Sequence, residues 1–194
     1  MATALIVLAA GQGTRMNSDL PKVLHRLGAA PLFAHALAAG RALEPARVIV
    51  VAGHGADQVA KAVAKYDPEA EVVLQEEQLG TGHAVAQAMP ALAGFQGRAV
   101  VLYGDTPFIR PETLEAMLAA RRGHAVVVLG FHAADPGRYG RLLTEGDQLQ
   151  AIREWKDATE AERAVTLCNS GVICASAAVL FDLVAQIGNA NAAG

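Results

Sequence analysis

Five short, almost uninterrupted apolar runs punctuate residues 3–131, and a segment of helical character separates each run from the next. Apolar runs without polar alternation are typical of strands buried on both faces, as in a parallel sheet. Strands that alternate with helices in this way form right-handed crossovers. The sequence therefore predicts an α/β fold with a Rossmann-like, mostly parallel and twisted sheet flanked by helices. The predicted strands are Thr3–Ala9, Arg47–Ala52, 71–75, Arg98–Tyr103 and 125–131.

The pattern changes after Phe131. Residues 139–154 alternate polar and apolar residues on both sides of a Gly-Asp pair, which predicts a small β-hairpin beside the main sheet. A further strand is predicted at 168–175. The predicted helices are the segment that follows Pro31, a residue suited to a first helical turn, and residues 57–65, 81–89, 111–121 and 176–187.

The composition indicates one globular domain over residues 1–194 and excludes several function classes. Hydrophobic residues make up 53% of the chain and charged residues 18%, which supplies a core and excludes global disorder. The formal net charge is −3 without a cluster of Lys and Arg, so no nucleic-acid partner is expected. The sequence shows no long apolar stretch and no signal peptide, so we expect a cytoplasmic protein with no membrane partner. Cys168 and Cys174 are too far apart along one strand to pair and are expected to be buried thiols.

Ligands of parallel α/β sheets bind at the carboxyl ends of the strands, so the loops there carry the functional information. The loop Gly11–Met16 (GQGTRM) follows the first strand, and its glycines let backbone N–H groups approach a phosphate closely. Arg15 can hold phosphate oxygens in a bidentate way, and Lys22 after Pro21 offers a compact positive charge. The loop matches neither a Walker A motif nor the GxGxxG fingerprint. The alternative is that Gly11–Met16 is only a tight strand-to-helix turn in which Arg15 is solvated.

Two further strand ends carry polar residues. Gln75 offers both a donor and an acceptor, which can read the edge of a base. Gly80 and Thr81 lie at a predicted helix start, where free N–H groups favour anionic or carbonyl ligands. Asp105 follows the fourth strand and suits Mg²⁺, which prefers one or two protein carboxylates together with substrate phosphates. The alternative for Gly80 and Thr81 is a capped helix start that binds no ligand. The alternative for Asp105 is a capping aspartate.

Covalent catalysis is not indicated by the sequence. The six histidines show no metal-binding spacing, and no GxSxG elbow is present. A Rossmann dehydrogenase is disfavoured because the third glycine of its loop is missing and no acidic residue ends the second strand.

Seven motifs, read together, carry a family resemblance. They are LAAGQGTRM, LPKVLH, VLQEEQLGTGHA, LYGDTPFI, YGR, REWKDAT and CNSGV, in this order along the chain. The chain resembles the N-terminal uridyltransferase domain of the bacterial bifunctional N-acetylglucosamine-1-phosphate uridyltransferases/glucosamine-1-phosphate acetyltransferases. The G-x-G-T-R-M loop is shared by many sugar nucleotidyltransferases. The QLGTGHA and YGDTP motifs, with KDAT and CNSG downstream, narrow the resemblance to these uridyltransferases. It extends over essentially all 194 residues.

The resemblance implies a Mg²⁺-dependent reaction of UTP with N-acetylglucosamine 1-phosphate that gives UDP-N-acetylglucosamine and pyrophosphate for cell-wall precursors. It implies Arg15, Lys22 and Asp105 as catalytic residues, with Asp105 as the magnesium ligand. It assigns Gln75 to uracil, and Gly140, Glu154, Asn169 and Tyr103 to the sugar. The implied substrate-binding residues are Leu8, Ala9, Ala10, Gly11, Gly13, Lys22, Gln75, Gly80, Thr81, Tyr103, Gly104, Gly140, Glu154 and Asn169.

The resemblance also implies that the family domain continues past residue 194. The expected remainder holds an asparagine that is the second metal ligand and the acetyltransferase β-helix, which forms a homotrimer in the full-length protein. On this expectation the chain alone could be inactive. The alternatives are a nucleotidyltransferase for another nucleotide or sugar, and a non-catalytic module that binds a sugar nucleotide.

Overall fold

The structure is a computed structural model that describes residues 1–11, 13 and 16–188. These residues fall into two compact units. The first holds Met1–Val127 and Ile173–Ile187, and the second holds Val128–Val172. Strand β10, Leu167–Ser176, therefore contributes its first residues to the second unit and its last residues to the first.

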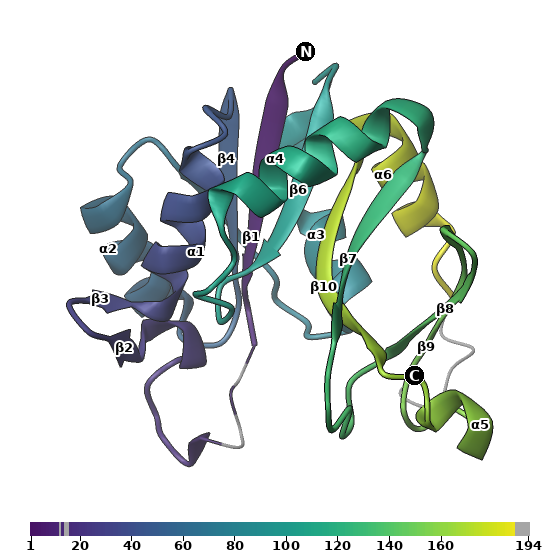
Figure 1. The fold of residues 1–194 in the computed structure, drawn as a ribbon. Coiled ribbons are helices and arrows are strands. Elements are labelled where there is room, and N and C mark those ends of the chain that lie inside the picture. Colours follow the sequence, from purple (N-terminus) through teal and green to yellow (C-terminus); the bar gives the residue numbers. More distant parts are fainter. Residues whose placement is uncertain (12, 14–15, 189–194) are drawn as a thin grey trace. The chain divides into compact units, whose positions relative to one another are not determined.

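A mostly parallel sheet forms the centre of the first unit (Figure 1). Strand β1 pairs in parallel with β4 and β6, β5 extends the sheet beyond β4, and the end of β10 runs antiparallel to β6. All seven residues of β1 are buried, because both faces of this central strand are covered. The predicted α/β fold is confirmed. The strands are β1 Thr3–Ala9, β4 Arg47–Ala52, β5 Glu71–Leu74 and β6 Arg98–Tyr103.

Helices cover both faces of this sheet, with α1, α2 and α4 on one face and α3 and α6 on the other (Figure 1). Alternate side chains of β1, Ile6 and Leu8, share a core with α3 and α6. On the opposite face a Cβ atom at Gly40 would lie 2.4 Å from Leu5, so α1 needs glycine there. No helix of the described residues combines the length and apolar character required to cross a bilayer. The helices are α1 Leu32–Arg41, α2 Ala56–Tyr66, α3 Thr81–Gln87, α4 Pro111–Ala120 and α6 Ala177–Ala185.

Two helices of the first unit, α1 and α3, differ from the prediction at one end. Pro31 has an extended backbone and is the N-cap of α1 instead of part of its first turn. Helix α3 ends at Gln87 instead of residue 89 because Pro90, which has no N–H to donate, opens a 3₁₀ turn. The short elements are η2 Lys22–Leu24, β2 Arg26–Leu27, β3 Ala30–Pro31, η3 Pro90–Leu92 and η4 Arg121–Gly123.

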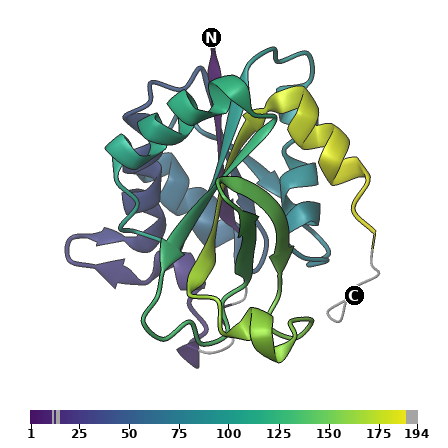
Figure 2. The same cartoon turned by 45° about the vertical axis from the view of Figure 1, so that its right-hand side comes forward.

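The second unit contains the predicted β-hairpin, whose strands lie side by side in Figure 2. Gly146 has a φ of 57° in the connecting turn, a conformation that glycine adopts without strain. Strand β7 pairs with β10, and a capping box between Thr159 and Glu162 starts the short helix α5. The elements are β7 Val126–His132, β8 Arg141–Glu145, β9 Gln148–Arg153 and α5 Glu160–Arg163.

Both cysteines are buried and free, as predicted. Burial raises the pKa of the Cys174 thiol, which makes its reactive thiolate form scarcer at neutral pH. Cys168 donates a hydrogen bond to the Thr166 carbonyl at 3.4 Å. The two thiols therefore act as small core side chains.

Arg141 is the largest fully buried side chain, with 2% of its surface exposed. Its guanidinium donates to the carbonyls of Arg163 at 3.0 Å and Gly137 at 3.0 Å, and also to those of Tyr139 and Pro136. Removal of the buried guanidinium leaves these carbonyls without their donor and an apolar side chain in its place. We therefore expect Arg141→Leu to lower the free energy of unfolding by about 2 kcal/mol, measured by urea denaturation.

Arg153→Leu is the matched control for this prediction. Arg153 lies on the paired strand β9, is 43% exposed and forms an ion pair with Glu162. Exposed ion pairs contribute little, so this variant should lose no more than about 0.5 kcal/mol. Equal losses in the two variants would show that the carbonyl bonds of Arg141 do not stabilise the unit.

Candidate active site

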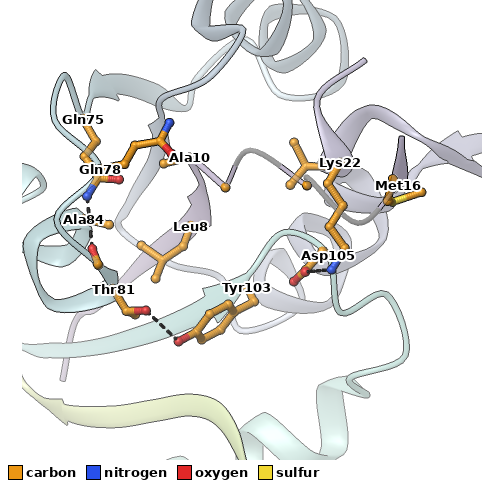
Figure 3. A pocket seen from close by; sticks show the side chains of 14 residues that line it. Leu8, Ala10, Met16, Lys22, Gln75, Gln78, Thr81, Ala84, Tyr103 and Asp105 are labelled. Atoms are coloured by element: carbon orange, nitrogen blue, oxygen red, sulfur yellow. Dashed lines mark hydrogen bonds and ion pairs between the residues drawn. The ribbon is translucent and has the colours of Figure 1, made fainter. Parts of the chain in front are cut away.

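A pocket of about 440 Å³ lies in the first unit, at the carboxyl ends of its parallel strands (Figure 3). The strands are in level register, with Leu8 opposite both Val51 of β4 and Tyr103 of β6. The loops that follow β1 and β6 therefore start at the same height and meet at one edge of the sheet. The lining residues are Leu8, Ala10, Gly11, Gly13, Met16, Lys22, Val23, Gln75, Gln78, Gly80, Thr81, Ala84, Tyr103 and Asp105.

The turn after β6 positions Asp105. The N–H group of Gly104 donates to the Leu8 carbonyl at 2.8 Å, and a Cβ atom on Gly104 would lie 3.1 Å from that oxygen. Thr106 closes the turn by donating from its hydroxyl to the Tyr103 carbonyl at 2.8 Å. Asp105 is thus held between two anchored neighbours, with its side chain 25% exposed beside the pocket.

Close glycine contacts position Lys22. A Cβ atom on Gly13, whose φ is 62°, would lie 2.7 Å from the Lys22 Cβ. A Cβ atom on Gly55 would lie 2.4 Å from the Pro21 ring. Both contacts require glycine, and they hold Pro21 and Lys22 between the loops that contain Gly13 and Gly55.

Lys22 and Asp105, which both line the pocket, form an ion pair (Figure 3). The ammonium Nζ donates to Oδ2 of Asp105 at 2.6 Å. The pair brings a donor suited to phosphate oxygens and an acceptor suited to a divalent cation into direct contact. If the pair opens, the ammonium can bind a phosphate and the carboxylate can bind a metal ion.

The donor set fits Mg²⁺ better than a metal held by the protein alone. No group of three or more His, Cys, Asp or Glu side chains gathers into a metal site within the described residues. A single partly exposed carboxylate suits Mg²⁺, which takes one or two protein carboxylates and fills its remaining positions with water and substrate phosphates. Asp105 is the residue that fits this role.

Gln75 lies at the other end of the pocket from Lys22 in Figure 3. It follows β5, its own N–H donates to the Ala52 carbonyl at 2.7 Å, and only 4% of the residue is exposed. Its amide Nε2 donates to the Gly80 carbonyl at 3.1 Å. Gly80 is the N-cap of α3 and Thr81 is its first residue, so the free N–H groups of the helix start lie beside the Gln75 amide.

A separate cluster lies in the second unit. Asn169 donates its backbone N–H to the Gly140 carbonyl at 2.8 Å. A Cβ atom on Gly140 would lie 2.9 Å from Oε1 of Glu154 and 3.6 Å from the Asn169 Cβ. Three of the four residues that the resemblance assigns to the sugar are therefore brought together, although 14 or more positions separate them in the sequence.

Ten of the residues predicted for the site line the first-unit pocket. Ala9 and Gly104 are not among the lining residues. Ala9 is fully buried in β1, and the N–H group of Gly104 donates to the Leu8 carbonyl. Arg15 lies outside the described residues. Met16, Val23, Gln78 and Ala84 line the pocket but were not predicted; all four fall in or beside the predicted loops. The ten are Leu8, Ala10, Gly11, Gly13, Lys22, Gln75, Gly80, Thr81, Tyr103 and Asp105.

Comparison with known proteins gives closely similar sequences. Residues 5–171 match the profile of the MobA-like NTP transferase domain family. Relatives named bifunctional protein GlmU are 72% identical in Cereibacter sphaeroides, 67% in Paracoccus denitrificans and 61% in Ruegeria pomeroyi. These alignments cover 98%, 98% and 100% of this chain but 42%, 42% and 43% of the relatives. The chain therefore spans less than half the length of these relatives.

Solved structures share the fold at low sequence identity. A UDP-glucose pyrophosphorylase complexed with UDP-glucose gives a TM-score of 0.73 at 16% identity, covering 96% of this chain and 80% of that chain. HddC from Yersinia pseudotuberculosis, complexed with GMP-PN, gives a TM-score of 0.74 at 23% identity, covering 92% and 79%. Both likenesses support the same α/β architecture.

Proposed function

Because this chain belongs to the family of MobA-like NTP transferase domains, we propose that it is a uridyltransferase acting on UTP and N-acetylglucosamine 1-phosphate. The products are pyrophosphate and UDP-N-acetylglucosamine, and the sugar nucleotide serves peptidoglycan and lipopolysaccharide synthesis in the cytoplasm. Support for these substrates comes from the seven sequence motifs and from relatives that are 61–72% identical.

The observation that carries the proposal is the arrangement of the pocket. It joins a 2.6 Å ammonium–carboxylate pair, Lys22 and Asp105, with a buried amide, Gln75. A nucleoside triphosphate needs positive charge and a divalent cation at its phosphates, and hydrogen-bonding groups at its base. The pocket offers both kinds of group in one cavity, which favours a nucleotide as the ligand.

The reaction requires alignment and charge neutralisation more than proton transfer. An oxygen of the sugar phosphate attacks the α-phosphorus of UTP, and the bond from that phosphorus to the bridging oxygen breaks to release pyrophosphate. The attacking phosphate is already an anion, so no general base is needed. Lys22 would bind phosphate oxygens, and the resemblance assigns Arg15 to the β- and γ-phosphates of UTP.

Asp105 would hold Mg²⁺ in this reaction. When bound, Mg²⁺ supplies positive charge that neutralises the phosphates as they approach each other. Asp105 would no longer pair with Lys22 when it holds the metal ion, which would leave the ammonium available to bind phosphate.

The sugar is assigned to the second unit on the basis of the resemblance. Glu154 and Asn169, together with the Gly140 backbone, would bind the hydroxyl and acetamido groups of N-acetylglucosamine. For a longer protein that contains this chain, the resemblance also suggests a homotrimer. Tyr103 keeps the sugar-binding role that the resemblance implies.

A pyrophosphate-release assay tests the proposed function. The purified chain is incubated with UTP, N-acetylglucosamine 1-phosphate and Mg²⁺, and we expect equal amounts of pyrophosphate and UDP-N-acetylglucosamine. Reactions with EDTA, or without the sugar phosphate, should release none. Turnover with dTTP, CTP or GTP in preference to UTP would favour another sugar nucleotidyltransferase. Calorimetric binding of UDP-N-acetylglucosamine without any pyrophosphate release would favour a non-catalytic binding module.

A further inference from the structure

The amide of Gln75 has both of its hydrogens directed at protein atoms. Its Nε2 lies 3.1 Å from the Gly80 carbonyl oxygen and 3.0 Å from Nδ1 of His83. A carboxamide nitrogen carries two hydrogens, so these two contacts use its whole donor capacity. The carbonyl Oε1 is the polar atom of the side chain that remains for a ligand.

The Gly80 carbonyl fixes which end of the amide faces it. If the Gln75 amide were turned by 180°, its oxygen would face the Gly80 oxygen, and two acceptors would meet without a hydrogen between them. The nitrogen must therefore point toward Gly80. Since the same nitrogen faces His83, Nδ1 of the His83 ring has to accept a hydrogen bond.

The acceptor role at Nδ1 determines the tautomer of His83. A neutral ring that accepts at Nδ1 carries its hydrogen on Nε2. The Gln87 amide lies 3.1 Å from Nε2 and 3.2 Å from the His83 carbonyl. A neutral ring accepts at one nitrogen only, so the Gln75 and Gln87 amide nitrogens compete for it. Gln87 is only partly buried and can shift away from the ring while it donates to the carbonyl, whereas Gln75 is 4% exposed and has no such freedom. His83 thus connects one turn of α3 to the base end of the pocket.

We propose that His83 is a positioning residue which acts with the Gly80 carbonyl to hold the Gln75 amide, so that the pocket presents a hydrogen-bond acceptor to the base of the nucleotide. The proposal rests on the nucleotide function given above. A base with an imide N–H between two carbonyls, as in uracil, donates to Oε1 of Gln75. Cytosine carries an unprotonated ring nitrogen at the same position, so two acceptors would face each other. His83 therefore contributes to the choice of UTP over CTP without contacting the base.

Burial makes the arrangement selective. Gln75 is 4% exposed, so water cannot easily replace a missing partner at its amide. A site built around a buried hydrogen bond rejects a ligand that lacks the matching group far more strongly than it rejects a change in size. Guanine also carries a ring N–H, so the discrimination assigned to this amide is between the two pyrimidines.

Calorimetric titration of the chain with UTP and with CTP, in Mg²⁺, tests the proposal. In His83→Leu the Gln75 nitrogen keeps the Gly80 carbonyl as its one partner, so turning the amide to offer a donor to cytosine costs one hydrogen bond instead of two. We expect the preference for UTP over CTP to fall by about 10- to 100-fold. His83→Asn places an amide oxygen near the position of Nδ1 and should retain most of the preference. His124→Leu, an exposed histidine in the same unit, is the matched control.

Pyrophosphate binding reports whether the phosphate end of the pocket is intact in each variant. His83→Leu should bind pyrophosphate with the parental affinity. An unchanged preference for UTP in that variant, or a joint loss of pyrophosphate and nucleotide binding, would overturn the positioning role. A parent chain that binds UTP and CTP equally would also overturn it. A parent chain that binds no nucleotide would refute the proposed function itself.

The side-chain amide of Gln75 gives a second readout in ¹⁵N-resolved NMR spectra. In the parent both amide hydrogens are hydrogen-bonded, so we expect two well-separated resonances with slow exchange. In His83→Leu one resonance should move toward the position of a free amide. Identical Gln75 resonances in the two proteins would contradict the contact on which the inference depends.

Discussion

Substitution of Asp105 by asparagine is expected to lower the rate of UDP-N-acetylglucosamine formation by 10²- to 10³-fold, or about 3–4 kcal/mol of transition-state stabilisation. Asparagine has nearly the same shape and can still accept a hydrogen bond from Lys22, so the pocket should keep its structure. It lacks the charge that attracts Mg²⁺. The magnesium concentration that gives half of the maximal rate should therefore rise together with the loss of rate.

A magnesium titration of initial rates measures this effect. Asp57→Asn is the matched control, because Asp57 is an exposed carboxylate in the first turn of α2 and does not line the pocket. The control should follow the parental titration curve. A curve for Asp105→Asn that overlays on the parent would refute the role of Asp105 as the metal ligand.

Substitution of Lys22 by alanine is expected to lower kcat by about 2–4 kcal/mol, or roughly 30- to 1000-fold, if the ammonium acts as one preorganised phosphate donor. The ion pair itself should cost little when lost, because the Lys22 side chain is 41% exposed. Removal of Lys22 also leaves Asp105 without its competing cation. The apparent affinity for Mg²⁺ should therefore stay the same or increase.

This opposite response to magnesium separates the two roles. Steady-state kinetics at several magnesium concentrations would show a lower kcat in Lys22→Ala without a weaker metal affinity. Lys61→Ala, an exposed lysine on α2, serves as the control for the loss of one positive charge. A parental kcat in Lys22→Ala would remove this residue from the mechanism.

Parallel strands were the part of the fold that sequence patterns predicted best. A strand buried on both faces has to be apolar at every position, and β1, β4 and β6 have the predicted bounds. The two-residue strands β2 and β3 are too short to leave a pattern. Helix α5 is also short, but its capping box, Thr159 to Glu162, was a readable signal that the prediction did not use.

The candidate site was predictable where residues follow strand ends. Lys22, Gln75 and Asp105 come from three separate loops, and the level register of the sheet brings these loops to one pocket. The apolar wall of the pocket depends on tertiary packing, so Val23 and Ala84 carried no local signal. The direction of the Gln75 amide depends on its neighbours in the folded chain and could not be predicted from composition or spacing.

The contact between Lys22 and Asp105 also affects what can enter the pocket before catalysis. A lone metal ion has to displace the ammonium from its carboxylate, and a lone phosphate has to draw the ammonium away from it. When the cation and the triphosphate arrive as one complex, the cation takes Asp105 and the triphosphate takes Lys22. Neither charged side chain is then left without a partner. The two ligands should therefore reinforce each other's binding, because the paired charges of Lys22 and Asp105 attract a lone ion of either sign only weakly.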